Sequence, residues 1–158
     1  MWQRLPDTGG LKSMNKIEDA FKNKKAFIPF VTAGDPSLDV TRELILAMQE
    51  AGADLIEIGI PFSDPVAEGP VIQEADDRAL SAGVTTDKIF DMVDDIADKI
   101  HVPIVFMTYI NPIYVYGVEK FAKRAKACGA AGVIVPDVPF EEKEEIRGSF
   151  EAEGLVVI

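Results

Sequence analysis

The chain has 158 residues, 47% of them hydrophobic and 27% charged, which predicts one soluble globular domain with a sizeable core. It contains no apolar run of about 18 residues, so we expect no membrane-spanning helix. The net charge of −11 argues against nucleic acid or anionic membranes as partners, because binding either one requires basic patches.

Cysteine and histidine each occur once, and this limits the chemistry available to the chain. The single cysteine, Cys128, excludes an internal disulfide and a cysteine metal cluster, and we expect no metal site. Residues 1–13 are polar and lack the apolar core of an export signal. We therefore expect a disordered extension there, a domain at residues 14–158 and a cytoplasmic location. His101 lies just before a predicted strand and is interpreted as a surface residue rather than a catalytic base.

Short apolar segments alternate along the chain with segments whose apolar residues recur at helical spacing. Strands are predicted at residues 27–33, 55–60, 104–109, 132–135 and 155–158. Helices are predicted at residues 17–24, 36–51, 70–82, 85–100, 118–127 and 141–153. Asp35 is expected to cap the second helix, with Pro36 in its first turn, and Thr85 to cap the fourth. Asn111 and Pro112 are expected in a loop.

The alternation of strands and helices predicts βαβ units and a parallel sheet. A doubly wound sheet usually carries a glycine-rich phosphate loop after its first strand, and residues 32–36 do not provide one. A (β/α)8 barrel places functional residues at the carboxyl ends of its strands, where Glu57, Tyr109 and Asp137 lie. We therefore predict an α/β fold of the (β/α)8 barrel type. Because a complete barrel needs roughly 250 residues, we expect four βα units plus the fifth strand, as the N-terminal portion of a longer protein.

The most informative segment is residues 54–73, which begins as a buried strand and continues as an acidic loop. Side chains alternate faces along a strand, so Glu57 shares one face with a leucine and a glycine, whereas the other face carries only isoleucines. A carboxylate in that position is unfavourable unless it is paired or used. Asp64 and Glu68 follow in a loop stiffened by prolines. This combination predicts an active site.

Residues 56–73 read Ile-Glu-Ile-Gly-Ile-Pro-Phe-Ser-Asp-Pro-Val-Ala-Glu-Gly-Pro-Val-Ile-Gln and closely resemble the signature of the tryptophan synthase α subunit family. The resemblance implies a barrel that cleaves indole-3-glycerol phosphate into indole and glyceraldehyde-3-phosphate without a metal or organic cofactor. It also implies a β subunit as partner, in an α2β2 assembly. Pyridoxal phosphate is expected only in that partner.

The same resemblance implies roles for particular residues. It makes Glu57 the catalytic acid and base and Glu68 the second catalytic carboxylate. The family usually has aspartate in the second position, in Ala-Asp-Gly-Pro, whereas residues 67–70 read Ala-Glu-Gly-Pro. The implied substrate-binding residues are Phe30, Met107 and Tyr109. The implied residues of the interface with the β subunit are Pro61, Ser63, Asp64 and Asp137.

Each assignment has a structural alternative that the sequence leaves open. Glu57 could form a buried ion pair, and Glu68 could be an exposed loop acid. Phe30 and Met107 could simply belong to the barrel core. Asp64 could stabilise its turn, and the same holds for the other interface acid.

Other functions also remain open. The chain could be a non-catalytic partial barrel that self-associates or binds a partner through the apolar edge at residues 155–158. It could also be a barrel that acts on another phosphorylated metabolite. In the resembling family, glycine-rich turns and a helix N-terminus after later strands hold the phosphate. We therefore expect little or no turnover from the 158 residues alone.

Overall fold

The computed structural model describes residues 16–22, 25–139, 141–142 and 144–158. Within them, five parallel strands form one sheet in the order of the chain. The strands are β1 (Phe30–Thr32), β2 (Ile56–Gly59), β3 (Ile104–Met107), β4 (Gly132–Ile134) and β5 (Val156–Val157). A doubly wound sheet reverses its strand order part-way, whereas strands that add in one direction are those of a (β/α)8 barrel. The topology therefore favours the predicted barrel. The extension predicted at residues 1–13 lies outside the described residues.

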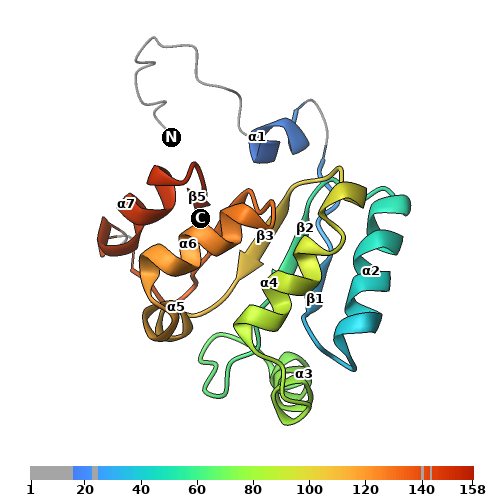
Figure 1. Ribbon diagram of the computed structural model, residues 1–158, viewed down its shortest axis with the longest axis horizontal. Helices are drawn as coiled ribbons and strands as arrows, with labels where there is room; N and C mark the ends of the chain where they lie inside the picture. Colours follow the sequence, from blue (N-terminus) through green and yellow to red (C-terminus); the bar gives the residue numbers. More distant parts are fainter. Residues whose placement is uncertain (1–15, 23–24, 140, 143) are drawn as a thin grey trace.

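Helices connect the strands and lie mainly on one side of the sheet (Figure 1). They are α1 (Lys16–Ala20), α2 (Leu38–Glu50), α3 (Pro70–Ser81), α4 (Thr86–Asp94), the 3-10 helix η1 (Ala97–Lys99), α5 (Ile110–Tyr116), α6 (Val118–Ala127) and α7 (Glu144–Ala152). In Figure 1, α4 lies in front of the strands and α2 lies beside β1, whereas α3 and α5 lie below the carboxyl ends of the strands. The short helix α1 lies at the opposite, amino-terminal end.

The two faces of the sheet have different neighbours, as the alternation along β2 predicts. Ile56, Ile58 and Ile60 belong to the main core between the sheet and the helices. In that layer the ring of Phe90 packs edge-on against the ring of Phe106, with 5.2 Å between centroids. The opposite, inner face forms a smaller apolar cluster, composed of Ile17, Leu55 and Val105 with Ile28, Ala131, Ile134 and Val156 around them. The prediction of which residues share a face is confirmed.

The start of α2 differs from the prediction. Ser37, not Asp35, is the N-cap, and its hydroxyl accepts a hydrogen bond from the main-chain N–H of Val40 at 3.2 Å. The helix therefore begins at Leu38 and Pro36 precedes it. Asp35 is engaged elsewhere, because its carboxylate binds Arg78.

A second difference is α5, which occupies the segment predicted as a loop. The Asp137 carboxylate accepts a hydrogen bond from the main-chain N–H of Ile110 at 2.9 Å and thus caps this helix from another loop. Gly117, with φ of +93°, ends it. A short helix capped by a residue 27 positions away carries little local signal in the sequence. The predicted strand 104–109 is correspondingly shorter, and Tyr109 becomes the residue before α5.

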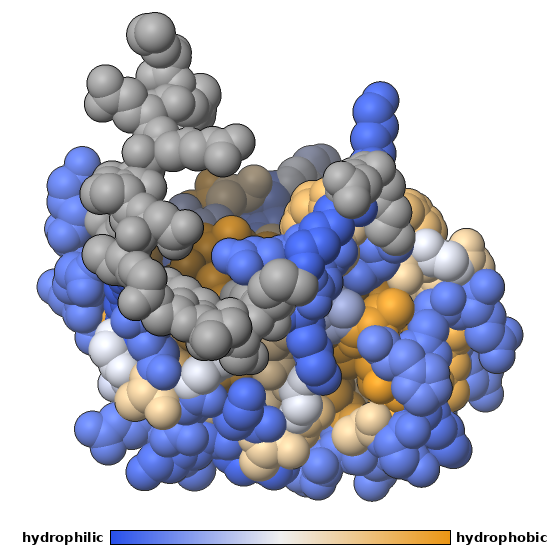
Figure 2. Space-filling view, turned by 90° about the horizontal axis from the view of Figure 1, so that it is seen from above, coloured by the Kyte–Doolittle hydropathy of each residue, from blue (hydrophilic) through white to orange (hydrophobic). Residues whose placement is uncertain are grey.

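No helix in the described part of the chain is long and apolar enough to cross a membrane. Seen from the amino-terminal end of the strands, the molecule has a mostly hydrophilic rim with hydrophobic residues showing inside it (Figure 2). Hydrophilic residues thus surround the apolar interior at this end of the sheet. The candidate functional side chains lie at the opposite, carboxyl end.

Candidate active site

Glu57 lies on the inner face of β2, between Phe30 of β1 and Val105 of β3 in the register of the sheet. Its side chain is half-buried, and desolvation raises the pKa of its carboxyl above the usual range. Among the described residues, no hydrogen bond or ion pair to this carboxylate is found. The alternative of a buried ion pair is therefore not supported. An acid with a raised pKa retains its proton closer to neutral pH, as a general acid requires.

Apolar side chains surround this acid. A Cβ atom on Gly59 would lie 2.6 Å from Cζ of Phe30, so the glycine leaves room for that ring at the carboxyl end of β2. Met107 is paired with Gly59 on the next strand. Both Phe30 and Met107 are only half-buried, so part of each side chain is free to contact a ligand. Their role in substrate binding stays a prediction.

Tyr109 holds the loop that follows β2, residues 60–69, which we call the acidic loop. Its hydroxyl accepts hydrogen bonds from the main-chain N–H groups of Val66 at 3.1 Å and Ala67 at 2.8 Å, and it donates one to Glu68. One donor and two acceptor positions are all that a phenol offers. The hydroxyl therefore has no capacity left for a ligand. Its predicted substrate contact is confined to the ring, which is 3% exposed with its neighbours in place.

Glu68 is fixed at the end of the acidic loop. It is half-buried and accepts the Tyr109 hydrogen bond, so it is not the freely exposed loop acid of the alternative interpretation. Its carbonyl oxygen also accepts a hydrogen bond from the side-chain amide of Gln73 at 2.8 Å. Directly after it, Gly69 and Pro70 begin α3. The second acid is thus held between Tyr109, the residue before α5, and the first turn of α3.

Asp76 is a third acid beside this loop, and the sequence analysis missed it. It lies on the buried face of α3 with Ala75 and Ala79 and is only 6% exposed. Its pKa is raised to about 6, mainly by desolvation and to a smaller extent by the charges of Glu68 and Asp77. An acid within an otherwise apolar helical face is the signal that could have revealed it.

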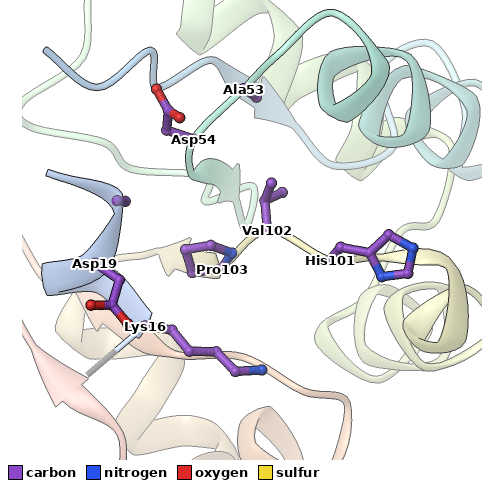
Figure 3. Close-up of a pocket in the computed structure, with 8 residues that line it drawn as sticks. Lys16, Asp19, Ala53, Asp54, His101, Val102 and Pro103 are labelled. Atoms are coloured by element: carbon purple, nitrogen blue, oxygen red, sulfur yellow. The ribbon is translucent and has the colours of Figure 1, made fainter. Parts of the chain in front are cut away.

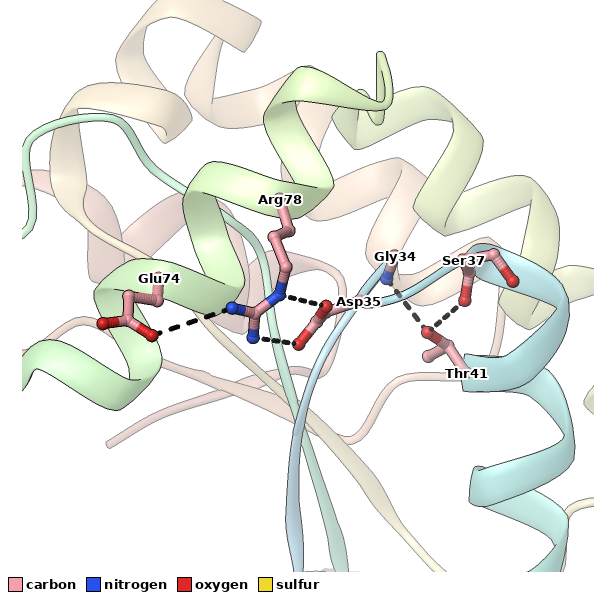
Figure 4. A network of polar contacts seen from close by, with 6 residues as sticks. All are labelled: Gly34, Asp35, Ser37, Thr41, Glu74 and Arg78. Atoms are coloured by element: carbon pink, nitrogen blue, oxygen red, sulfur yellow. Dashed lines mark hydrogen bonds and ion pairs between the residues drawn. The ribbon is translucent and has the colours of Figure 1, made fainter.

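A polar network ties the β1–α2 loop to α3 (Figure 4). The Arg78 guanidinium donates two hydrogen bonds to the Asp35 carboxylate, each at 2.9 Å, and this pairing lowers the pKa of Asp35. On the other side, the N–H of Gly34 donates to the Thr41 hydroxyl at 2.9 Å. Glu74 lies 3.8 Å from the same guanidinium. The loops after β1 and β2 are therefore connected through one helix.

Comparison with known proteins places this arrangement in a family. A model of the tryptophan synthase alpha chain family matches residues 17–158. The tryptophan synthase alpha chain of Petrotoga mobilis is 49% identical over 142 residues, covering 90% of this chain and 55% of that protein. The alpha chain of Lacticaseibacillus casei is 47% identical over 145 residues, covering 92% and 54%. The chain belongs to the tryptophan synthase alpha chain family. It spans about half the length of the curated relatives it matches.

Solved structures agree with this assignment. A crystal structure of the tryptophan synthase alpha chain from Legionella pneumophila matches with a TM-score of 0.85 and 38% identity, covering 92% of this chain and 57% of that one. The tryptophan synthase complex of Pyrococcus furiosus matches with a TM-score of 0.79 and 42% identity, covering 84% and 55%. These alpha chains are TIM barrels, so the described sheet is part of a (β/α)8 barrel. The predicted fold and the predicted family are confirmed.

The residues implied for the partner interface of a tryptophan synthase alpha chain differ in their exposure. Ser63 and Asp64 are exposed, and the serine hydroxyl donates to the aspartate at 2.6 Å. Pro61 is buried, so it can act only by shaping the loop. Asp137 is half-buried and caps α5. The structure shows what each residue does within the chain, and their contact with a partner stays a prediction.

A pocket of about 310 Å³ lies at the other end of the strands, between α1 and the segments that lead into β2 and β3 (Figure 3). Lys16, Asp19, Asp54 and His101 contribute its polar side chains. The imidazole of His101 is directed away from the two residues of α1 in Figure 3. As predicted, this histidine is exposed at the joint between a helix and a strand. In a (β/α)8 barrel the chemistry belongs to the carboxyl end instead.

Proposed function

We propose that the chain supplies the acid–base residues of an active site that cleaves indole-3-glycerol phosphate into indole and glyceraldehyde-3-phosphate. The observation that carries the proposal is Glu57, an acid without a cation partner among the described residues, on the inner face at a strand's carboxyl end. Desolvation raises the pKa of its carboxyl above the usual range, which is the direction that a general acid requires. The acidic loop adds Glu68, held in place by Tyr109.

The reaction is a retro-aldol cleavage whose protons balance without a cofactor. Glu57 gives a proton to the indole ring carbon that bears the side chain. A proton leaves the adjacent side-chain hydroxyl, its oxygen forms the aldehyde, and the carbon–carbon bonding electrons return to the ring. Glu57, now a carboxylate, takes up that proton and is regenerated. Glu68 stabilises the positive charge that develops on the ring nitrogen in between.

The surroundings suit this substrate. Phe30 and Met107 provide apolar walls of the kind that a flat aromatic ring requires. Exposed Ser63 and Asp64 lie on the same loop as Glu68. A β subunit that carries pyridoxal phosphate would contact these two residues, so its binding would be coupled to the position of Glu68. The proposal also gives the protein a cytoplasmic location, in keeping with its buried thiol at Cys128.

The test uses a chimera in which residues 17–158 replace the matching segment of the Petrotoga mobilis alpha chain. Indole release from indole-3-glycerol phosphate is measured with and without a β subunit. We expect turnover that Glu57→Gln reduces by about 100-fold to 10,000-fold, the usual contribution of acid–base catalysis. Glu50→Gln, which changes an exposed acid at the end of α2, should have no effect.

Two outcomes would contradict the proposal. One is a folded chimera that releases no indole. The other is a chimera whose activity survives Glu57→Gln. The 158-residue chain is assayed in parallel and is expected to show little or no turnover.

A further inference from the structure

The loop after β4 reaches the beginning of α5. Asp137, in the turn that follows β4, accepts a hydrogen bond from the main-chain N–H of Ile110, at 2.9 Å for one carboxylate oxygen and 3.2 Å for the other. Tyr109 is the N-cap residue of α5, but its own side chain makes no cap hydrogen bond. A carboxylate from another loop thus fills the place that an N-cap side chain normally takes.

The side chain of Tyr109 is engaged with the acidic loop instead. Its hydroxyl accepts hydrogen bonds from the N–H groups of Val66 at 3.1 Å and Ala67 at 2.8 Å, and it donates one to Glu68. The ring packs against that of Phe62, with 5.3 Å between centroids. The cap of α5 and the loop that carries the second acid are therefore joined by a single residue.

The rest of α5 is anchored separately from its first turn. The helix has only 7 residues, which is too short for it to be stable without outside contacts. Ile113 is fully buried in the main core, and the hydroxyl of Tyr116, the last residue of α5, donates a hydrogen bond to Asp87 of α4. The first turn is fixed by the hydrogen bond from Ile110 to Asp137. Loss of that bond should therefore loosen the residue before the helix and leave its far end in place.

We propose that Asp137 is a positioning residue for the reaction, which caps α5, thereby fixes Tyr109 and, through the hydroxyl of that tyrosine, sets where Glu68 is held. The proposal rests on the function proposed above, but the contacts can be tested without substrate. Asp137 takes no part in the proton transfers. Its effect on the rate comes only from the position of Glu68, because small displacements of a catalytic group reduce the rate strongly.

The first test measures amide hydrogen exchange in the 158-residue chain by NMR. We expect Asp137→Ala to speed the exchange of the Ile110 and Ala67 amides by about threefold to tenfold, because loss of a helix cap favours local opening by about that factor. Asp137→Asn keeps an acceptor oxygen and should retain most of the protection. Thr85→Ala removes the cap of α4, which binds the N–H of Lys88 at 3.3 Å, and should leave both amides unchanged.

The second test measures kcat in the chimera without a β subunit, so that a lost partner contact cannot contribute. Asp137→Ala should lower kcat by about threefold to tenfold and change KM less than twofold, because Glu68 acts on charge that develops during the reaction. Asp137→Asn should restore most of the activity, and Thr85→Ala should not change it.

The decisive variant combines Asp137→Ala with Tyr109→Phe. Because the cap acts through the tyrosine hydroxyl, the double variant should be no slower than Tyr109→Phe alone. If the two losses in kcat multiply instead, Asp137 does not act through that hydroxyl and the proposal is overturned. It is also overturned if Asp137→Asn is as slow as Asp137→Ala, or if the Ala67 amide exchanges at the same rate in Asp137→Ala as in the unsubstituted chain.

Should Asp137→Ala fail to fold, native-state exchange of the unsubstituted chain decides. Opening of the cap releases the loop under the proposal, so the Ala67 amide must not be more protected than the Ile110 amide. Greater protection of Ala67 would overturn it. Faster loop exchange in Asp137→Ala, together with a chimera that releases no indole, would refute the proposed reaction and uphold the connection between the two loops.

Discussion

The two ends of the sheet treat their polar groups differently. At the amino-terminal end, the side-chain oxygen of Gln49 accepts hydrogen bonds from the N–H groups of His101 at 2.6 Å and Val102 at 3.3 Å, and its amide donates to Lys99 at 3.0 Å. At the carboxyl end, Glu57 and Asp76 are partly or fully desolvated carboxyl groups with no cation beside them among the described residues. The Gln49 side chain is thus hydrogen-bonded through both its oxygen and its nitrogen, whereas these two acids have no cationic partner in the described part of the chain.

This difference has a consequence for stability. A carboxyl group whose pKa is raised in the folded state disfavours the fold once it ionises. The stability that Glu57 and Asp76 contribute is therefore complete below their unfolded pKa values and is lost as the pH rises through their folded ones, about 6 for Asp76. The desolvated acids at the carboxyl end are therefore expected to reduce stability as the pH rises, which is the kind of cost that functional sites carry.

The largest effect expected beyond the catalytic acid comes from releasing the acidic loop. Tyr109→Phe removes the hydroxyl that binds Val66, Ala67 and Glu68. Because a displacement of about 1 Å can cost about 100-fold in rate, we expect kcat of the chimera to fall about 10-fold to 100-fold. The free energy of unfolding should fall by only about 1–2 kcal/mol. Indole release and urea unfolding measure the two effects.

A matched control is available on α5. Tyr114→Phe also removes a hydroxyl, one that donates to Glu145 at 2.7 Å on an exposed part of the surface. It should leave kcat unchanged. If Tyr109→Phe keeps more than half of the activity, the acidic loop does not depend on this hydroxyl, and the contrast between the two ends is weakened.

The carboxyl end was also the harder end to predict. The alternation along β2 placed Glu57 on the inner face correctly, because that pattern is local and has a period of two. The partners of Tyr109 lie 42 and 43 residues away, and no local pattern links them. The family resemblance assigns Tyr109 to substrate binding, and that role stays a prediction. What the sequence did not indicate is that its hydroxyl also binds the acidic loop.

Asp76 and α5 show the same limit. The bounds of the helix that contains Asp76 were predicted almost to the residue. The effect of the Glu68 charge on this buried acid depends on the folded chain and has no local signal in the sequence. The helix α5 begins where Asp137, from another loop, provides the cap. Local sequence patterns predict helices, strands and the residues that share a face. Contacts between loops at the end of a barrel depend on the tertiary fold.

At the amino-terminal end, a substitution should affect stability alone. Gln49→Ala removes three hydrogen bonds to the segment between η1 and β3. Water can reach most of these groups, so we expect the free energy of unfolding to fall by about 1 kcal/mol. The activity of the chimera should not change. Glu50→Ala, at the exposed next position, is the control for helix propensity. A loss of kcat in Gln49→Ala would show that the two ends are not independent.

The smallest expected effect concerns the ion pair between Arg78 and Asp35. Arg78→Lys cannot reproduce the two parallel hydrogen bonds, but the arginine side chain is 55% exposed, and exposed ion pairs contribute little. We expect the melting temperature to fall by less than in Gln49→Ala. Added salt should reduce the difference further, because it screens exposed charges.

The pH dependence of this ion pair has the opposite sign to that of Asp76. Arg78 lowers the pKa of Asp35 below its usual value of 3.8, so the pair stabilises the fold above that value and loses its effect as the pH falls through the lowered one. Asp76, on the same helix, loses its contribution as the pH rises through about 6. Melting curves of the chain and of Arg78→Lys should therefore converge in acid and stay apart at pH 5. A difference that persists unchanged in acid would assign the effect to packing of the arginine side chain instead of its charge.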